Sequence, residues 1–244
     1  MRPLLGTGRV PSIASIKAGL AGVVALAFLH LTSTSVARAA SNDWTGSTRV
    51  DSATVYAAPG GAIKGTLERG TSVQVLSWLY GPPLTPDNYT WADLGDGRFV
   101  HSSVLRHAPL PATPPPLPQI ISPGHWADAN LTQQILTLYD GDTPVRVALM
   151  NSGRPGPDTE SHPGVWPILR RVANERMQGD GYDISGVLFT QYFTTDAEAL
   201  HLNYWLTDDE RGIPRSHGCL GLAYDDAAFA WRFLDAGALV FVHS

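Results

Sequence analysis

The sequence predicts a mainly β fold, and three observations carry this prediction. Its 244 residues include 19 prolines and 24 glycines, which interrupt the chain with turns at short intervals. Hydrophobic residues make up 43% of the chain and charged residues only 16%, a balance that supplies a core without the charged faces of a helical bundle. The apolar residues recur in short alternating runs, the pattern of half-buried strands.

The amino terminus has the pattern of an export signal. The first 17 residues are basic, residues 18–31 form an apolar run, and the Ala-Arg-Ala triplet at 37–39 is typical of a cleavage site. The apolar run is shorter than the ~20 residues that cross a bilayer comfortably. We therefore expect residues 1–40 to be a signal peptide, or an uncleaved anchor that is the protein's only membrane contact. In either case the rest of the chain is exported, to the periplasm or the extracellular cell wall.

A proline-rich segment divides the remainder. Residues 108–119 contain six prolines, which favour an extended, semi-rigid spacer and exclude a sheet interior. We expect this linker to join a domain at 41–107 to a domain at 120–244. The formal net charge of −5 argues against nucleic acid as the main partner.

Before the linker, short apolar segments alternate with turns. We expect strands at 50–56 and 72–78, and a break in the chain at the Gly-Pro-Pro of 81–83. Residues 91–94 and 98–101 flank a Gly-Asp-Gly turn and are predicted to form a hairpin. Short strands at this spacing predict a small barrel.

This segment resembles bacterial SH3-like domains. The resemblance rests on a Tyr-Ala-Ala-Pro-Gly turn at 56–60, on Leu-Glu-Arg-Gly-Thr at 67–71, and on Trp91 with the Gly-Arg-Phe-Val-His-Ser-Ser of 97–103. It implies a small SH3-like barrel. For each of Trp78, Trp91 and Phe99 taken separately, we favour core packing over contact with a ligand.

After the linker, a second series of elements is predicted. We expect three strands, a short helix and a final strand, at 126–129, 133–139, 145–150, 227–234 and 238–243. Asp225 or Asp226 is expected to cap the helix, and Gly237 to end it.

The most informative residue is the single cysteine, Cys219. A free thiol is mostly protonated at neutral pH, so a nucleophilic cysteine needs a base, and histidine titrates in the useful range. Two histidines are available: His217, two residues away, and His201, 18 residues upstream, on what we expect to be a neighbouring strand. Gly218 lets the backbone approach a substrate closely, and backbone N–H groups there could hold an oxyanion during acyl transfer.

The run Ser216-His217-Gly218-Cys219, with Gly-x-Pro just before it and a histidine 18 residues earlier, resembles the L,D-transpeptidase (YkuD-like) catalytic domain. The resemblance extends from about Gly124 to the carboxyl end and implies a β-sandwich-like fold that uses no cofactor or metal. It implies Cys219 as the nucleophile and His201 as the general acid/base. Ser216, His217 and Gly218 would shape the pocket, with the backbone amides of the last residue and the cysteine near the oxyanion.

Two positions depart from the family pattern. Leu202 stands where glycine or serine is usual, although its carbonyl can still orient the preceding histidine. Gly221 stands where arginine or asparagine is usual, which removes a polar contact. We also expect Leu202, Tyr192 and Tyr204 to lie along the substrate cleft, although core packing accounts equally well for the two tyrosines.

The expected function is the cross-linking of peptidoglycan stem peptides through a cysteine acyl-enzyme. With water as the acceptor, the same chemistry gives an L,D-carboxypeptidase, and the sequence does not separate these outcomes. A wall-binding protein without activity is the alternative that Gly221 raises.

Two further readings are less favoured. A cysteine peptidase of the NlpC/P60 kind has its histidine after the cysteine, but here only His243 follows Cys219. Zinc held by His201, His217 and Cys219 lacks an evident fourth ligand.

Overall fold

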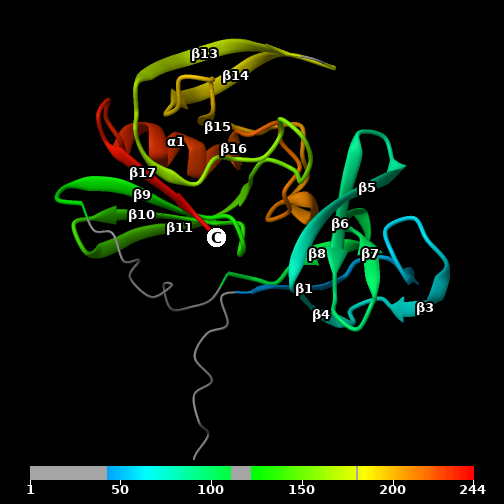
Figure 1. Ribbon diagram of the computed structural model, residues 1–244. Helices are drawn as coiled ribbons and strands as arrows, with labels where there is room; N and C mark the ends of the chain where they lie inside the picture. The colour runs from blue at the N-terminus through cyan, green and yellow to red at the C-terminus, as the bar shows by residue number, and fades with distance from the viewer. Residues whose placement is uncertain (1–42, 111–121, 180) are drawn as a thin grey trace, which may run out of the picture. The chain divides into compact units, whose positions relative to one another are not determined.

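The computed structural model describes residues 43–110, 122–179 and 181–244, and residues 40–244 form one compact unit (Figure 1). The expected export segment and most of the proline linker lie outside the described residues. The described part is mainly β with one α-helix, which confirms the predicted fold class. None of its helices has the length and apolar character needed to cross a membrane.

The strands before the linker form two antiparallel sheets. A three-stranded sheet has the order β4-β1-β8, and a five-stranded sheet has the order β3-β2-β7-β6-β5. The strands are β1 (Trp44–Thr48), β2 (Ser52–Tyr56), β3 (Ile63–Glu68), β4 (Ser72–Val75), β5 (Ser77–Thr85), β6 (Asn88–Asp93), β7 (Phe99–His101) and β8 (Leu105–His107), with a 3-10 turn, η1, at Ser102–Val104. The predicted hairpin corresponds to β6 and β7, which pair antiparallel.

The expected break at residues 81–83 is wrong, because these residues lie inside β5. β5 is an edge strand of its sheet, where a proline without an N–H is tolerated. The pairing of β5 with β6 shifts register between Tyr80 and Thr85, so the strand bends around the prolines instead of ending at them. The single strand expected at 72–78 is likewise divided between β4 and β5.

Alternating burial along β1 and β2 builds the core of these sheets. Trp44, Val55 and Val100 are at most 5% exposed and pack together with Ile213, which belongs to the segment just before Cys219. The first part of the chain therefore shares its core with a loop of the second part.

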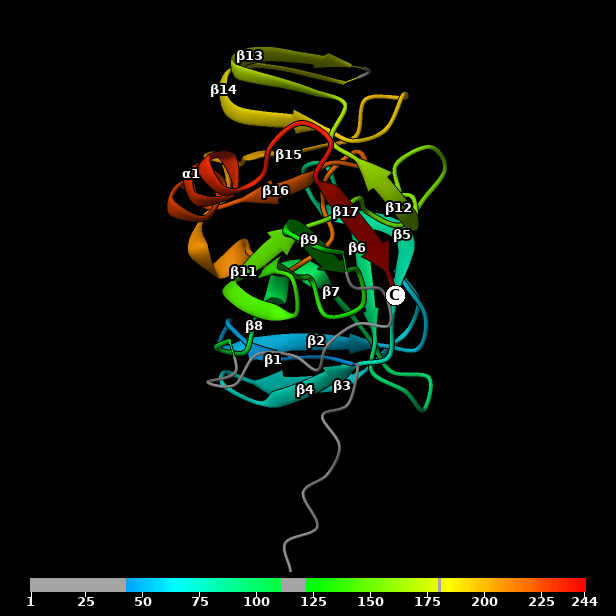
Figure 2. The ribbon, with the colours of Figure 1, turned by 90° about the vertical axis from the view of Figure 1, so that its left-hand side faces the viewer.

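The strands after the linker form one nine-stranded sheet with the order β12-β17-β9-β10-β11-β16-β15-β14-β13 (Figures 1 and 2). Two of its pairs, β17 with β9 and β15 with β16, are parallel, and the others are antiparallel. The strands are β9 (His125–Asn130), β10 (Ile135–Asp140), β11 (Thr143–Asn151), β12 (Gly164–Pro167), β13 (Arg170–Gly179), β14 (Tyr182–Tyr192), β15 (Ala199–Leu202), β16 (Leu220–Leu222) and β17 (Leu239–His243), with a 3-10 turn, η2, at Asp208–Glu210.

The helix α1 (Tyr224–Phe233) packs beside β14, β15 and β16 (Figure 1). It places Ala227 and Ala230 in the core together with Leu200 and Leu220. The predicted ends of the helix are wrong: Ala223 is the N-cap and Leu234 the C-cap. Because the helix begins earlier than expected, the two aspartates lie in its first turn, where negative charge favours the positive end of the helix dipole.

Candidate active site

The register of two parallel strands indicates that the predicted catalytic pair shares one face of the sheet. In the register of β15 with β16, His201 lies opposite Gly221, and Leu200 lies opposite Leu220. Cys219 immediately precedes β16, two residues before Gly221, so its side chain projects to the same face as His201. Because the pairing is parallel, residues 18 apart in sequence become diagonal neighbours on one face of the sheet.

The imidazole of His201 is held in one tautomer. The side chain is 4% exposed, and Nδ1 donates a hydrogen bond to the carbonyl of Leu202 over 2.8 Å. Trp205 stacks on the ring with 5.8 Å between centroids. Burial lowers the pKa of His201 below its ordinary value. The ring is therefore neutral at rest, with Nε2 free to accept a proton.

The thiol of Cys219 is protonated in the resting protein. Its pKa is raised to about 12, mainly by burial and to a lesser degree by the carboxylates of Glu198 and Glu175, while the backbone N–H of Ala199 acts in the opposite direction. Sγ contacts the carbonyl oxygen of Ala197 at 3.8 Å. The side chain is half-buried, so a reagent can still reach the sulfur. A neutral thiol beside a neutral imidazole requires that the base remove the proton as the thiol attacks.

Hydroxyl groups hold the loop before the cysteine. Ser216 Oγ donates to the carbonyl of Cys219 at 2.6 Å and accepts from the N–H of Gly218 at 3.1 Å. Ser161 Oγ donates to the carbonyl of Gly218 at 2.6 Å and accepts from the N–H of Gly153 at 2.9 Å. Gly218 has a φ of +114°, a conformation that L side chains rarely adopt. Its N–H is engaged within the loop, so the N–H of Cys219 is the better oxyanion donor.

A buried carboxylate supports the same loop. Glu198 is 5% exposed, and one of its oxygens lies 2.5 Å from Nδ1 of His162. The backbone N–H of His162 also donates to both carboxylate oxygens, at 3.1 and 3.3 Å. A Cβ at Gly218 would lie 3.3 Å from Cγ of Glu198, so this carboxylate packs directly against the loop of the cysteine.

The same cluster contains the one group of metal-ligating side chains in the part of the chain that the structure describes. Ligand atoms of His162, Asp196 and Glu198 lie within 4.8 Å of one another. The His162 nitrogen and a Glu198 oxygen are engaged with each other, which explains the cluster as an ion pair. His201, His217 and Cys219 do not form such a group among the described residues.

Two aromatic side chains of the β13–β14 hairpin, Tyr182 and Tyr192, lie within electrostatic range of Cys219. Tyr182 lies 4.8 Å from His217 between ring centroids, and the charge of Cys219 contributes to a raised pKa of Tyr182, after burial. The hydroxyl of Tyr192 donates to Glu175 at 2.7 Å. Burial, followed by Glu175, raises the pKa of Tyr192 well above its ordinary value, so this tyrosine is neutral.

The expected lining residues have different roles in the structure. Leu202 is buried and contributes its carbonyl to the histidine. Tyr204 is 53% exposed, and its hydroxyl donates to the carbonyl of Ser185 in β14. Trp205, which the sequence did not single out, is the aromatic residue that stacks on His201.

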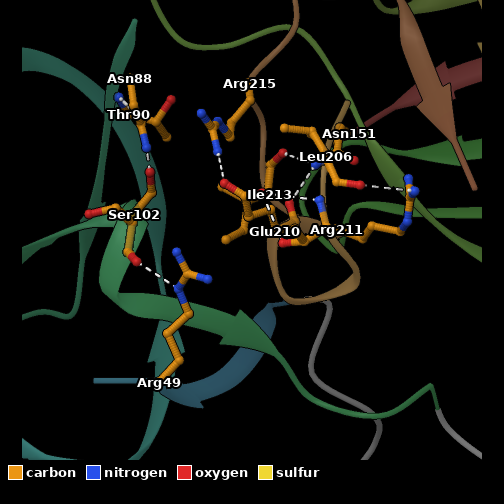
Figure 3. A network of polar contacts seen from close by, with 12 residues as sticks. Arg49, Asn88, Thr90, Ser102, Asn151, Leu206, Glu210, Arg211, Ile213 and Arg215 are labelled. Carbon is orange, nitrogen blue, oxygen red and sulfur yellow. Dashed lines mark hydrogen bonds and ion pairs between the residues drawn. The ribbon is translucent and has the colours of Figure 1, made fainter. Parts of the chain in front are cut away.

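The loop between β15 and the cysteine is anchored at several points (Figure 3). Nδ2 of Asn151 donates to the carbonyls of Glu210 and Ile213, each at 2.8 Å, and Arg215 forms an ion pair with Glu210 at 2.6 Å. From the first part of the chain, Thr90 Oγ1 donates to the carbonyl of Pro214 at 2.8 Å. These contacts fix the segment that leads into the site.

Sequence reasoning missed Glu198, Glu175, Tyr182 and Trp205. Their only sequence signal is proximity: Trp205 and Glu198 lie within four residues of His201. Glu175 and Tyr182 reach the site because a long hairpin returns them to it, and this pairing is invisible in a single sequence.

These features describe a cysteine site on the carboxyl-terminal half of the chain. Residues 124–242 match the family model of the L,D-transpeptidase catalytic domain (YkuD). The Ser-His-Gly-Cys segment resembles the L,D-transpeptidase catalytic domain, and the match confirms this resemblance. No curated protein sequence matches the chain.

Solved structures with a similar fold include three L,D-transpeptidases. That from Mycobacterium smegmatis is 19% identical with a TM-score of 0.45, and the match covers 49% of this chain and 58% of that one. One from Mycobacterium tuberculosis is 23% identical with a TM-score of 0.46, covering 50% and 59%. That from Stackebrandtia nassauensis is 22% identical with a TM-score of 0.42, covering 52% and 58%. The match therefore spans less than two thirds of each of these structures.

Proposed function

We propose that the protein is a peptidoglycan L,D-transpeptidase. The observation that carries the proposal is the placement of Cys219 and His201 on one face of two parallel strands, within a region that matches the catalytic domain. The resting site is neutral, because burial lowers the pKa of the histidine and raises that of the thiol. This state suits a base that acts during attack rather than a preformed ion pair.

In the first half of the proposed reaction, Sγ of Cys219 attacks the carbonyl carbon of the third residue of a tetrapeptide stem. Nε2 of His201 takes the thiol proton, and the Nδ1 bond to Leu202 holds the ring while it carries positive charge. The N–H of Cys219 stabilises the oxyanion. The peptide C–N bond breaks, His201 returns the proton to the amine of the leaving D-Ala, and a thioester remains on the enzyme.

In the second half, the amine of another stem attacks the thioester. His201 takes a proton from this amine, the C–S bond breaks, and the proton returns to the sulfur. The products are a new amide cross-link and the free thiol. Water in place of the amine gives the L,D-carboxypeptidase outcome. Of these two outcomes, we propose the cross-linking reaction, with peptidoglycan stem peptides as the substrate.

The aromatic and charged groups around the sulfur support a peptide substrate. Tyr182 contacts the ring of His217, two residues before Cys219, and Tyr192 donates a hydrogen bond to Glu175. Arg170 lies over the ring of Tyr192 at 4.2 Å and 3.9 Å from Glu175, which adds a cation to this group. Stem peptides carry carboxylates that such a cation can bind.

We also propose that residues 41–107 form an SH3-like domain. Residues 108–119 then form its linker, and residues 1–40 direct export. Two small sheets with a common core support the domain, and the composition of the two other segments supports their roles. The mass of the protein recovered from the producing cell tests the export signal: we expect a chain that begins near residue 40.

The test of the proposed function is covalent labelling by a carbapenem, followed by intact mass. Residues 40–244 are used, since they form one compact unit. We expect an adduct on the wild type and none on Cys219→Ala, and then turnover of a tetrapeptide stem with release of D-Ala. A folded wild type that forms no adduct and turns over no stem would contradict the proposal and favour the wall-binding alternative. The products formed in the presence of an amine acceptor separate the two activities. A transpeptidase gives a cross-linked dimer, and a carboxypeptidase gives the tripeptide alone.

A further inference from the structure

Gly221 leaves an opening in the row of side chains next to the catalytic histidine. Gly221 lies opposite His201 in β15 and, on its other side, opposite Asn151 in β11. Paired residues of neighbouring strands project to the same face of a sheet, so these three residues form one row. Without a side chain at its centre, the row would leave space beside the imidazole.

The side chain of Asn203 occupies this space. A Cβ at Gly221 would lie 2.8 Å from Nδ2 of Asn203 and 2.9 Å from its Cβ, closer than real Cβ contacts. Asn203 is 3% exposed. Its backbone N–H donates to the carbonyl of Leu222 at 2.8 Å, and its own carbonyl accepts from Arg211 at 3.1 Å. The amide is therefore fixed over Gly221, on the face that also carries the imidazole.

The amide has an unused hydrogen-bonding capacity. Oδ1 of Asn203 is buried and has no hydrogen-bond partner, and the same holds for Oδ1 of Asn151 on the other side of Gly221. A buried polar atom without a partner costs stability and points to a functional role. Asn203 follows by two residues, and so shares a face with, the histidine that becomes a cation when it takes the thiol proton, whereas Asn151 lies two strands away from it. An amide oxygen near a developing cation lowers its energy.

We infer that Asn203 is a positioning residue for the reaction of Cys219 with its substrate. Its side chain fills the space that Gly221 leaves, keeps the imidazole of His201 directed at the sulfur, and turns an amide dipole toward the imidazolium. The inference rests on the proposed function. It also explains why glycine at position 221 can replace the arginine or asparagine that is usual there. The polar side chain comes from Asn203, after β15, instead of from β16.

The test exchanges the two side chains. We compare the wild type with Asn203→Ala, Gly221→Asn and the double variant Asn203→Gly/Gly221→Asn, and measure the rate of Cys219 acylation by a carbapenem. Asn203→Ala is expected to lower this rate roughly 10- to 100-fold, because the base loses its alignment. The double variant is expected to recover to within about threefold of the wild type, since the amide returns from the other strand. Gly221→Asn alone is expected to lose activity, because two side chains compete for one space.

A second readout separates positioning from loss of stability. The rate of Cys219 alkylation by iodoacetamide is followed against pH, and its acid limb reports His201. In Asn203→Ala we expect this limb to move to lower pH, because the imidazolium loses the amide oxygen that stabilises it. Asn130→Ala is the matched control: it removes another buried asparagine, on β9, and should change the melting temperature without changing the limb.

Two results would overturn the inference. One is an Asn203→Ala variant with the acylation rate and pH profile of the wild type. The other is a double variant that regains the wild-type melting temperature but stays as slow as Asn203→Ala. If the wild type itself forms no carbapenem adduct, the proposed function fails, and the alkylation profile still decides whether Asn203 acts on His201.

Discussion

The contact between His162 and Glu198 provides a quantitative prediction. The carboxylate side chain is 6% exposed, the imidazole side chain is 62% exposed, and the two approach to 2.5 Å. His162→Ala removes the imidazole and keeps the two backbone hydrogen bonds from residue 162. Among the described residues, His162 is the one cationic partner of the buried Glu198 carboxylate, and the variant removes it.

The magnitude follows from the exposure of the two groups. A hydrogen bond to a charged group contributes about 1.5–3 kcal/mol. Because solvent screens the exposed imidazole, we take a value around the lower end of this range, about 1–2 kcal/mol. For a unit of this size, each kcal/mol shifts the melting temperature by roughly 2–4 °C, so we expect a decrease of about 2–8 °C.

The decrease depends on pH. Glu198 raises the pKa of His162 above its ordinary value, first through the hydrogen bond and then through its charge. A histidine with a raised folded pKa contributes stability that is fully present below its unfolded pKa, about 6.5, and that is lost as pH rises through the folded value. Burial raises the pKa of Glu198 and the imidazole opposes this, so the burial of Glu198 makes the stability of both proteins fall with rising pH, and the histidine sets the difference between them. The difference between wild type and His162→Ala is therefore largest below about pH 6.5.

Thermal unfolding of both proteins over a pH series measures this difference. Arg176→Ala is the control, since it breaks an ion pair with Asp183 in which both groups are well exposed, and we expect no measurable change. Equal melting temperatures for wild type and His162→Ala below pH 6.5, or a difference that grows toward alkaline pH, would refute the reasoning. Because Glu198 packs on Gly218, we also expect slower acylation in His162→Ala.

Three further predictions concern the base, the link between the two parts and the core. His201→Gln should slow Cys219 alkylation about 10²–10⁴-fold, and the wild-type acid limb should lie below pH 6.5, because burial lowers the pKa of His201; a limb above that value would contradict this. Trp44→Phe removes the hydrogen bond of 2.5 Å from the indole to the carbonyl of Gly212 and should cost about 1 kcal/mol by denaturant unfolding, with a smaller loss if the bond is unimportant. Phe193→Ala empties a fully buried site and should cost about 3–5 kcal/mol in the same assay; a loss below 1 kcal/mol would show that the core closes around the gap.

Much of the strand content could be predicted because its signals are local. Alternation marks β2, and Gly-Asp-Gly marks the turn between β6 and β7. The errors have tertiary causes: β5 passes through Gly-Pro-Pro because an edge strand needs no N–H on its open side, and α1 begins earlier than its aspartates suggest.

The sequence by itself determined the chemistry available to this protein. One cysteine in Ser-His-Gly-Cys, with a histidine 18 residues earlier, indicated a thiol with a base, and the match at 124–242 agrees with that assignment. Only the tertiary structure decided how the groups work. Burial makes both the thiol and the imidazole neutral, and a carboxylate 21 residues before the cysteine supports its loop. Asn203 fills the space at Gly221 because parallel pairing places the end of β15 beside the end of β16. Such effects depend on which strands become neighbours, and that choice is made by long-range packing rather than by any local run of residues.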